Sequence, residues 1–281
     1  WGDLSVGLSA HGFYRESDMP GVNGRDVGRA ALDLGWRRGG VLPGGVLTTL
    51  AFAARAEHVR IHDDVVFTDP VNRQSAQAML EFRWPWAAAG ATGARYVVEP
   101  ILQVIEARRS GPGLPNDDNT MPELDEGNLF ALQRSSAEDA RDDGSRVNAG
   151  LRWARHDPDG WTAEALVGRI WRDAPLQGYP AGHSQPLGTT ESHWLLAGRV
   201  SNDDGYALSL RFLVDPENDL SRAETNLAWS TASTDVSTSY LYLPASAFEN
   251  RAVDLSEWSF DVTRRHANGW ATTFGWDYDV G

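Results

Sequence analysis

The sequence contains neither cysteine nor lysine, and these two absences exclude several kinds of chemistry. Without cysteine there is no disulfide framework, no thiolate metal site, no iron–sulfur cluster and no cysteine nucleophile. All 25 basic residues are arginine, and 39 acidic residues bring the formal net charge at pH 7 to −14. Because nucleic-acid binding depends on a clustered positive excess that neutralises phosphates, we do not expect nucleic acid as a partner.

Long apolar runs are also missing. The longest run, at about 84–91, is interrupted by Pro85. This excludes a transmembrane helix, which needs roughly 18 to 20 consecutive apolar residues. Hydrophobic residues nevertheless make up 41% of the 281 residues, with 12 tryptophans, and charged residues make up 23%. That composition is typical of a folded protein and unlike that of a disordered chain.

The segments between turn residues alternate apolar and polar side chains with a period of two, which is typical of β-strands. From 206 to 215, the even positions are apolar, whereas the odd positions include Ser209, Arg211 and Asp215. Windows with this alternation predict roughly thirteen strands. They lie at about 4–14, 28–37, 46–57, 77–84, 95–106, 146–154, 161–171, 193–200, 205–214, 224–231, 234–243, 255–264 and 270–279.

Three features favour an antiparallel transmembrane β-barrel of the outer-membrane type. Several windows are about ten residues long, the length at which a tilted strand crosses a bilayer. Short connectors at 38–40, 202–205 and 268–269 alternate with longer loops, the longest from about 108 to 145. Many tryptophans are expected at strand ends, as in the aromatic girdles of such barrels: Trp36, Trp84, Trp86, Trp153, Trp161, Trp171, Trp194 and Trp270. A soluble all-β domain with tryptophans in its core would show the same alternation, and that alternative stays open.

Several short stretches, by their order and spacing, resemble the LptD family of outer-membrane lipopolysaccharide assembly proteins, also called organic solvent tolerance proteins. They are LGWRR at 34–38, LPGG at 42–45, LEFRWP at 80–85, VVEPILQ at 97–103, PNDD at 115–118, DEGNLFALQR at 125–134 and GSRVNAGL at 144–151. The resemblance implies that residues 1–281 are an incomplete outer-membrane β-barrel segment. We then expect the family's N-terminal periplasmic domain and part of the barrel to be missing from this chain.

The resemblance also implies a function without chemical conversion. It suggests an outer-membrane translocon component that inserts lipopolysaccharide into the outer leaflet, with no cofactor. The implied partners are lipopolysaccharide, a plug lipoprotein of the LptE type, the periplasmic lipopolysaccharide-transport proteins and outer-membrane lipid. An outer-membrane porin or substrate-specific channel is an alternative function, and a soluble all-β binding domain is another.

The polar positions of the alternating windows provide candidates for a lumen-facing substrate path. We expect this path to include Asp33, Arg37, Glu81, Arg83, Arg146, Asn148, Arg152 and Arg211, and the family resemblance adds Glu99 and Gln103. Arginine suits phosphate recognition because its guanidinium can bind two oxygens at once. By resemblance, the loop at about 108–145 is extracellular and folds into the lumen through Leu129 and Phe130. Pro100 lacks an N–H group, so strand pairing is expected to loosen beside it.

The sequence predicts neither a catalytic nor a metal site. The densest acidic cluster comprises Asp117, Asp118, Asn119, Asp125 and Glu126. It fails the EF-hand spacing, because the sixth residue counted from Asp117 is Pro122 rather than glycine. Neither Gly-x-Ser-x-Gly nor His-Glu-x-x-His occurs, and the seven histidines, including His193, are expected on wet faces or in loops. Acidic residues such as Asp142 and Asp143 are expected at the surface of loops.

Overall fold

The computed structural model describes residues 1–17, 19–21, 23–115, 122–134, 141–176 and 185–280. The acidic residues Asp117, Asp118 and Asn119 lie outside this part. Within it, no helix is long and apolar enough to cross a membrane. The chain forms two compact units, the first made of 1–82, 103–122 and 130–147, the second of 83–102, 123–129 and 148–281.

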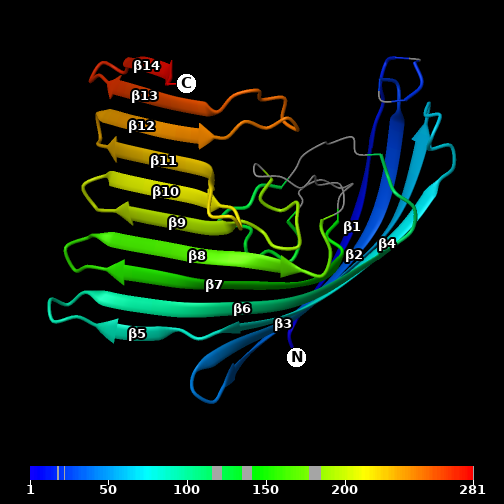
Figure 1. The fold of residues 1–281 in the computed structure, drawn as a ribbon, viewed down its shortest axis with the longest axis horizontal. Coiled ribbons are helices and arrows are strands. Elements are labelled where there is room, and N and C mark those ends of the chain that lie inside the picture. The colour runs from blue at the N-terminus through cyan, green and yellow to red at the C-terminus, as the bar shows by residue number, and fades with distance from the viewer. Residues whose placement is uncertain (18, 22, 116–121, 135–140, 177–184, 281) are drawn as a thin grey trace. The chain divides into compact units, whose positions relative to one another are not determined.

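The described residues form one antiparallel sheet of fourteen strands (Figure 1). The strands are β1 (Asp3–Phe13), β2 (Asp26–Leu42), β3 (Val46–His62), β4 (Val71–Arg83), β5 (Trp86–Ala89), β6 (Arg95–Ser110), β7 (Gly144–His156), β8 (Thr162–Arg172), β9 (Trp194–Ser201), β10 (Tyr206–Val214), β11 (Leu220–Ser230), β12 (Thr234–Leu243), β13 (Leu255–Arg265) and β14 (Ala271–Asp279). Strands pair in chain order from β1 to β14, except that β4 is followed by β6, and β5 pairs with β6 off this path. The all-β antiparallel class is therefore confirmed, whereas the strand order is open and does not close into a barrel.

Each of the thirteen predicted windows overlaps a strand, and the strand that was not predicted is β5. Its four residues, Trp-Ala-Ala-Ala, directly follow Pro85 and are too few and too uniform to alternate. Around Pro85, the strand that pairs with β6 changes from β4 to β5. Beyond the end of β4, the N–H of Trp84 donates to the carbonyl oxygen of Pro100 at 3.1 Å, and β5 then pairs with 95–98.

The expected turn at 38–40 is wrong. These residues belong to β2, which has 17 residues and pairs with β3 up to Leu42 and Val46. The turn lies at 43–45 instead, where Gly44 and Gly45 adopt positive φ angles of 84° and 80° that favour glycine. Trp36 consequently lies inside β2 and not at its end. The glycine pair Gly39-Gly40 suggested a turn, but both residues pair in register with Thr49 and Thr48 of β3.

In the second unit, the short hairpin turns between β7 and β8, β9 and β10, β11 and β12, and β13 and β14 lie together at one end of the strands (Figure 1). An antiparallel meander brings alternate connections to opposite ends of its strands. The connections at 173–193 and 244–254 therefore belong to the other end, together with the short one at 215–219. The predicted alternation of short turns and longer connections is found in this unit.

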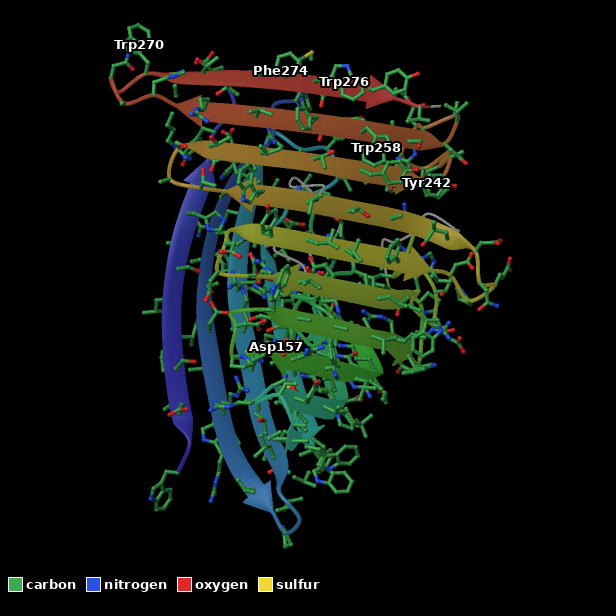
Figure 2. All side chains as sticks on the ribbon, turned by 90° about the vertical axis from the view of Figure 1, so that its left-hand side faces the viewer. Asp157, Tyr242, Trp258, Trp270, Phe274 and Trp276 are labelled. Carbon is green, nitrogen blue, oxygen red and sulfur yellow. The ribbon has the colours of Figure 1, made fainter. Side chains whose placement is uncertain are left out.

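One face of the second unit's sheet is aromatic. Trp229 lies beside Tyr206 in the register, with ring centroids 5.9 Å apart. Trp258 lies between Tyr240 and Tyr278 on neighbouring strands, and its ring is 5.2 Å from that of Tyr240. Trp258, Phe274 and Trp276 are exposed, and Figure 2 shows them on adjacent strands. An exposed patch of this size and character marks an interaction surface.

Candidate functional site on the polar face

Charged side chains of the first unit converge on one buried carboxylate. Glu57 of β3 accepts a hydrogen bond from Arg73 of β4. Its other oxygen lies 3.6 Å from Arg55 and 3.8 Å from Arg29. Arg55 also donates to the Asp33 carboxylate at 2.8 Å. Buried charges are stable only when opposite charges lie beside them. These contacts therefore fix the positions of β2, β3 and β4 relative to one another.

Farther along the same face, strand side chains bind the backbone of the long loop. Gln103 of β6 donates to the Glu81 carboxylate at 2.6 Å and to the carbonyl oxygen of Phe130 at 3.0 Å. Arg146 of β7 donates to the carbonyl oxygen of Leu132. The Leu132 side chain packs against a buried cluster of Ala51, Met79 and Ile105. The loop segment 130–134 is thus folded onto the polar face of the first unit.

Asp142 does not lie at the surface, as the sequence predicted, but is buried. Its carboxylate lies 3.1 Å from Arg134 and 3.2 Å from Arg146, and both guanidinium groups are buried as well. Burying two guanidinium groups is costly unless a negative charge compensates them. The Asp142 carboxylate supplies that charge, which explains why this acidic loop residue points inward. The prediction failed because loop acids are usually solvated and the alternation of strands says nothing about loops.

In the second unit, the loop segment 123–129 is held by a buried leucine and by ion pairs. Leu129 is fully buried and packs over Gly168 of β8, where a Cβ atom would collide with it. Glu126 accepts two hydrogen bonds from Arg211 of β10, at 2.8 and 2.9 Å. These hydrogen bonds lower the pKa of the Glu126 carboxyl from 4.5 and keep it ionised.

A second ion pair of this loop joins Glu123 to Arg222 of β11 at 3.2 Å. Arg211 and Arg222 also share Glu224, whose carboxylate lies 2.7 Å from Arg211 and accepts a hydrogen bond from Arg222. Both arginines therefore lie within reach of one anionic group. The polar face of the second unit thus has two guanidinium groups side by side, covered by glutamates of the loop.

The ten predicted path residues differ in their surroundings. Glu81, Gln103, Arg146 and Asn148 are buried, whereas Arg37 and Arg152 are exposed. The remaining four are half-buried: Asp33, Arg83, Glu99 and Arg211. Besides the ion pairs of Asp33 and Arg211 given above, Arg83 pairs with Glu99 at 3.4 Å and Arg152 with Glu164 at 3.2 Å. Their place on a substrate path stays a prediction, as does the inward role of Leu129 and Phe130.

Sequence reasoning missed the buried trio of Arg55, Glu57 and Arg73. Arg55 and Glu57 are spaced by two within the 46–57 window, so alternation could have found them. Arg73 precedes the 77–84 window, because β4 begins six residues earlier than predicted. Only the register between strands reveals that the three meet.

His193 lies in the connection that precedes β9, one of the two places predicted for the histidines, and it is buried. Its Nδ1 lies 2.6 Å from the Ser221 hydroxyl. The same hydroxyl lies 3.1 Å from the carbonyl oxygen of Leu213, so the histidine and the serine link the connection before β9 to β10 and β11.

Asp215, Glu217 and Asp219 in the β10–β11 connection form the group of carboxylates that could hold a metal ion among the described residues. Asp215 already accepts hydrogen bonds from the backbone N–H groups of Glu217 and Asp219, both at 2.9 Å. This pattern is that of a turn stabilised by an aspartate side chain. It explains the cluster without a cation.

Comparison with protein families matches residues 2–270 to the LptD family, described as LPS transport system D. Comparison with curated proteins finds no match. The family match spans almost the whole chain and includes β1 to β13 and both loop segments described above. LptD proteins are outer-membrane components of lipopolysaccharide transport and assembly and are not a family of enzymes. The chain therefore belongs to the LptD family of outer-membrane lipopolysaccharide-transport proteins.

Proposed function

We propose that this protein inserts lipopolysaccharide into the outer leaflet of the outer membrane, as part of a translocon. The polar face would carry the sugar and phosphate head groups, while the aromatic face meets membrane lipid. Lipopolysaccharide is both strongly polar and strongly apolar, so its passage needs a hydrated surface directly beside hydrocarbon.

The observation that carries this proposal is the separation of the two faces in the second unit. In β11, Asn226 pairs with Ser209 and Ser239, whereas the adjacent Leu227 pairs with Leu208 and Thr238. Leu227 is exposed, as are Trp258, Phe274 and Trp276 on its face. A soluble sheet would bury such a face, so this observation favours membrane contact over a soluble binding domain.

Partners follow from the same proposal. A plug lipoprotein of the LptE type would fill the space along the polar face, and periplasmic lipopolysaccharide-transport proteins would deliver the substrate. The inward fold of 130–134 supports an alternative function as a channel, because a loop on the polar face would narrow a pore. Conductance across a planar bilayer distinguishes the two: a channel conducts small ions steadily, whereas a translocon filled by its plug does not.

Photo-crosslinking tests the proposed function. A photoreactive residue at Asn226 should crosslink to lipopolysaccharide in growing cells, because this position is on the polar face. The photoreactive residue placed at Leu227 is the matched control on the opposite face. It should crosslink mainly to membrane lipid other than lipopolysaccharide. If Asn226 yields no lipopolysaccharide adduct in a correctly assembled protein, transport along this face is refuted.

A further inference from the structure

We infer that Arg211 and Arg222 form a binding site for the phosphate groups of a glycolipid head group, and that the loop glutamates Glu126 and Glu123 occupy this site until such a phosphate displaces them. The inference rests on the proposed function, because it names which chemical group of the lipopolysaccharide the polar face recognises.

The geometry of Glu126 on Arg211 is that of an anion in a guanidinium fork. Two nitrogens of Arg211 reach the two carboxylate oxygens at 2.8 and 2.9 Å. A phosphate presents oxygens with a similar spacing, and arginine binds either group through the same pair of N–H donors. The Glu126 carboxylate therefore stands where two phosphate oxygens would bind.

The second arginine makes the site suitable for phosphate in particular. Glu224 contacts Arg211 at 2.7 Å and also accepts a hydrogen bond from Arg222, so one small anion can contact both guanidinium groups. A phosphate monoester carries a charge of about −1.5 to −2 at pH 7. Replacing the singly charged Glu126 and Glu123 by one such group leaves the charge around the arginines almost unchanged.

The glutamates can be displaced because they are partly in water. The Glu126 side chain is 49% exposed and that of Glu123 is 60% exposed, against 25% for Arg211. Ion pairs at this exposure contribute little to stability, because water screens both charges. The buried ion pairs of Asp142 differ, because an incoming anion cannot reach them.

Binding of lipid A to two variants of the purified protein in detergent micelles tests the inference. Glu126→Gln removes the competing charge and should strengthen lipid A binding by about fivefold, whereas Arg211→Gln removes the ligand and should weaken it by about tenfold. Both variants break the same ion pair and should speed hydrogen exchange of 123–129 to a similar degree. If the Glu126–Arg211 ion pair only held the loop in place, both variants would change the affinity for lipid A in the same direction. That result would overturn the inference.

Two further measurements test whether the bound group is the phosphate of a lipid head group. Dephosphorylated lipid A should bind the wild-type protein and Glu126→Gln equally, because it lacks the group that competes with the carboxylate. Inorganic phosphate should open 123–129 only at concentrations about a hundredfold higher than lipid A, since it lacks the acyl chains. Equal potency of inorganic phosphate would refute a lipid head group as the source of the phosphate.

Arg199→Gln is the matched charge control, because Arg199 is exposed and pairs across β9 and β10 with Ser209, on the face of Arg211. It should change lipid A binding by less than twofold. A loss as large as that of Arg211→Gln would mean that general electrostatic attraction explains the binding. Failure of the inference would leave lipopolysaccharide crosslinking at Asn226 intact, whereas failure of the proposed function would abolish it in every variant.

Discussion

An arginine placed at position 260 should destabilise the protein far more than one placed at the adjacent position 259. β13 has eleven residues, and Phe260 is the sixth of them. At about 3.4 Å per residue and a tilt of about 45°, the strand spans roughly 26 Å of membrane height, close to the apolar band of an outer-membrane protein. Phe260 therefore lies near the midplane, on the face of its neighbour Trp276.

At that depth, Phe260→Arg should cost about 2–4 kcal/mol, because the guanidinium must enter hydrocarbon. Ser259→Arg points to the polar face, where Ser239 and Asp277 are the cross-strand neighbours. It should cost less than about 1 kcal/mol, because Asp277 can pair with the new charge.

The free energy of unfolding can be measured for both variants by guanidinium titration after refolding into lipid bilayers. The Phe260→Ala variant serves as a control for the loss of the ring without a new charge. Equal costs of the two arginines, or a larger cost at 259, would refute the assignment of the two faces.

Three further results are expected from the loop contacts. Gly168→Ala should cost about 1–3 kcal/mol by overpacking and speed proteolysis of 123–129, because its Cβ would meet Leu129. Asp142→Asn should lower the free energy of unfolding by about 3–5 kcal/mol, since two buried guanidinium groups lose their shared carboxylate. Because Arg211 lowers the Glu126 pKa from 4.5, the stability from this pair is present above pH 4.5 and is lost as the pH falls through the lowered value. The protection factor of 123–129 against hydrogen exchange should therefore be high at pH 7 and fall in acid; a protection factor that stays unchanged below the lowered pKa would contradict the ion pair.

Strand alternation predicted most of the fold, because burial of one sheet face imposes a period of two on the sequence itself. It also placed Gln103 and Arg146 on the polar face. It could not identify their partners, the carbonyl oxygens of Phe130 and Leu132, because every residue carries a carbonyl group and only the loop conformation selects one. For the same reason the burial of Asp142 could not be predicted. The pairing of distant charges depends on the register between strands, which the sequence of a single strand does not encode.

The long loop is held by two kinds of contact, and their energetics differ. Segment 130–134 is bound by buried hydrogen bonds and by Leu132, so opening it would expose unsatisfied polar groups and apolar surface. The turn around Glu126 is anchored by the buried Leu129, but its ion pairs are half-exposed, and an anion in solution can replace them. A substrate that carries phosphate can therefore change the loop locally at Glu123 and Glu126 while the buried segment stays in place. Recognition of the substrate then requires no unfolding of the loop, and its energetic cost is limited to the exchange of one anion for another.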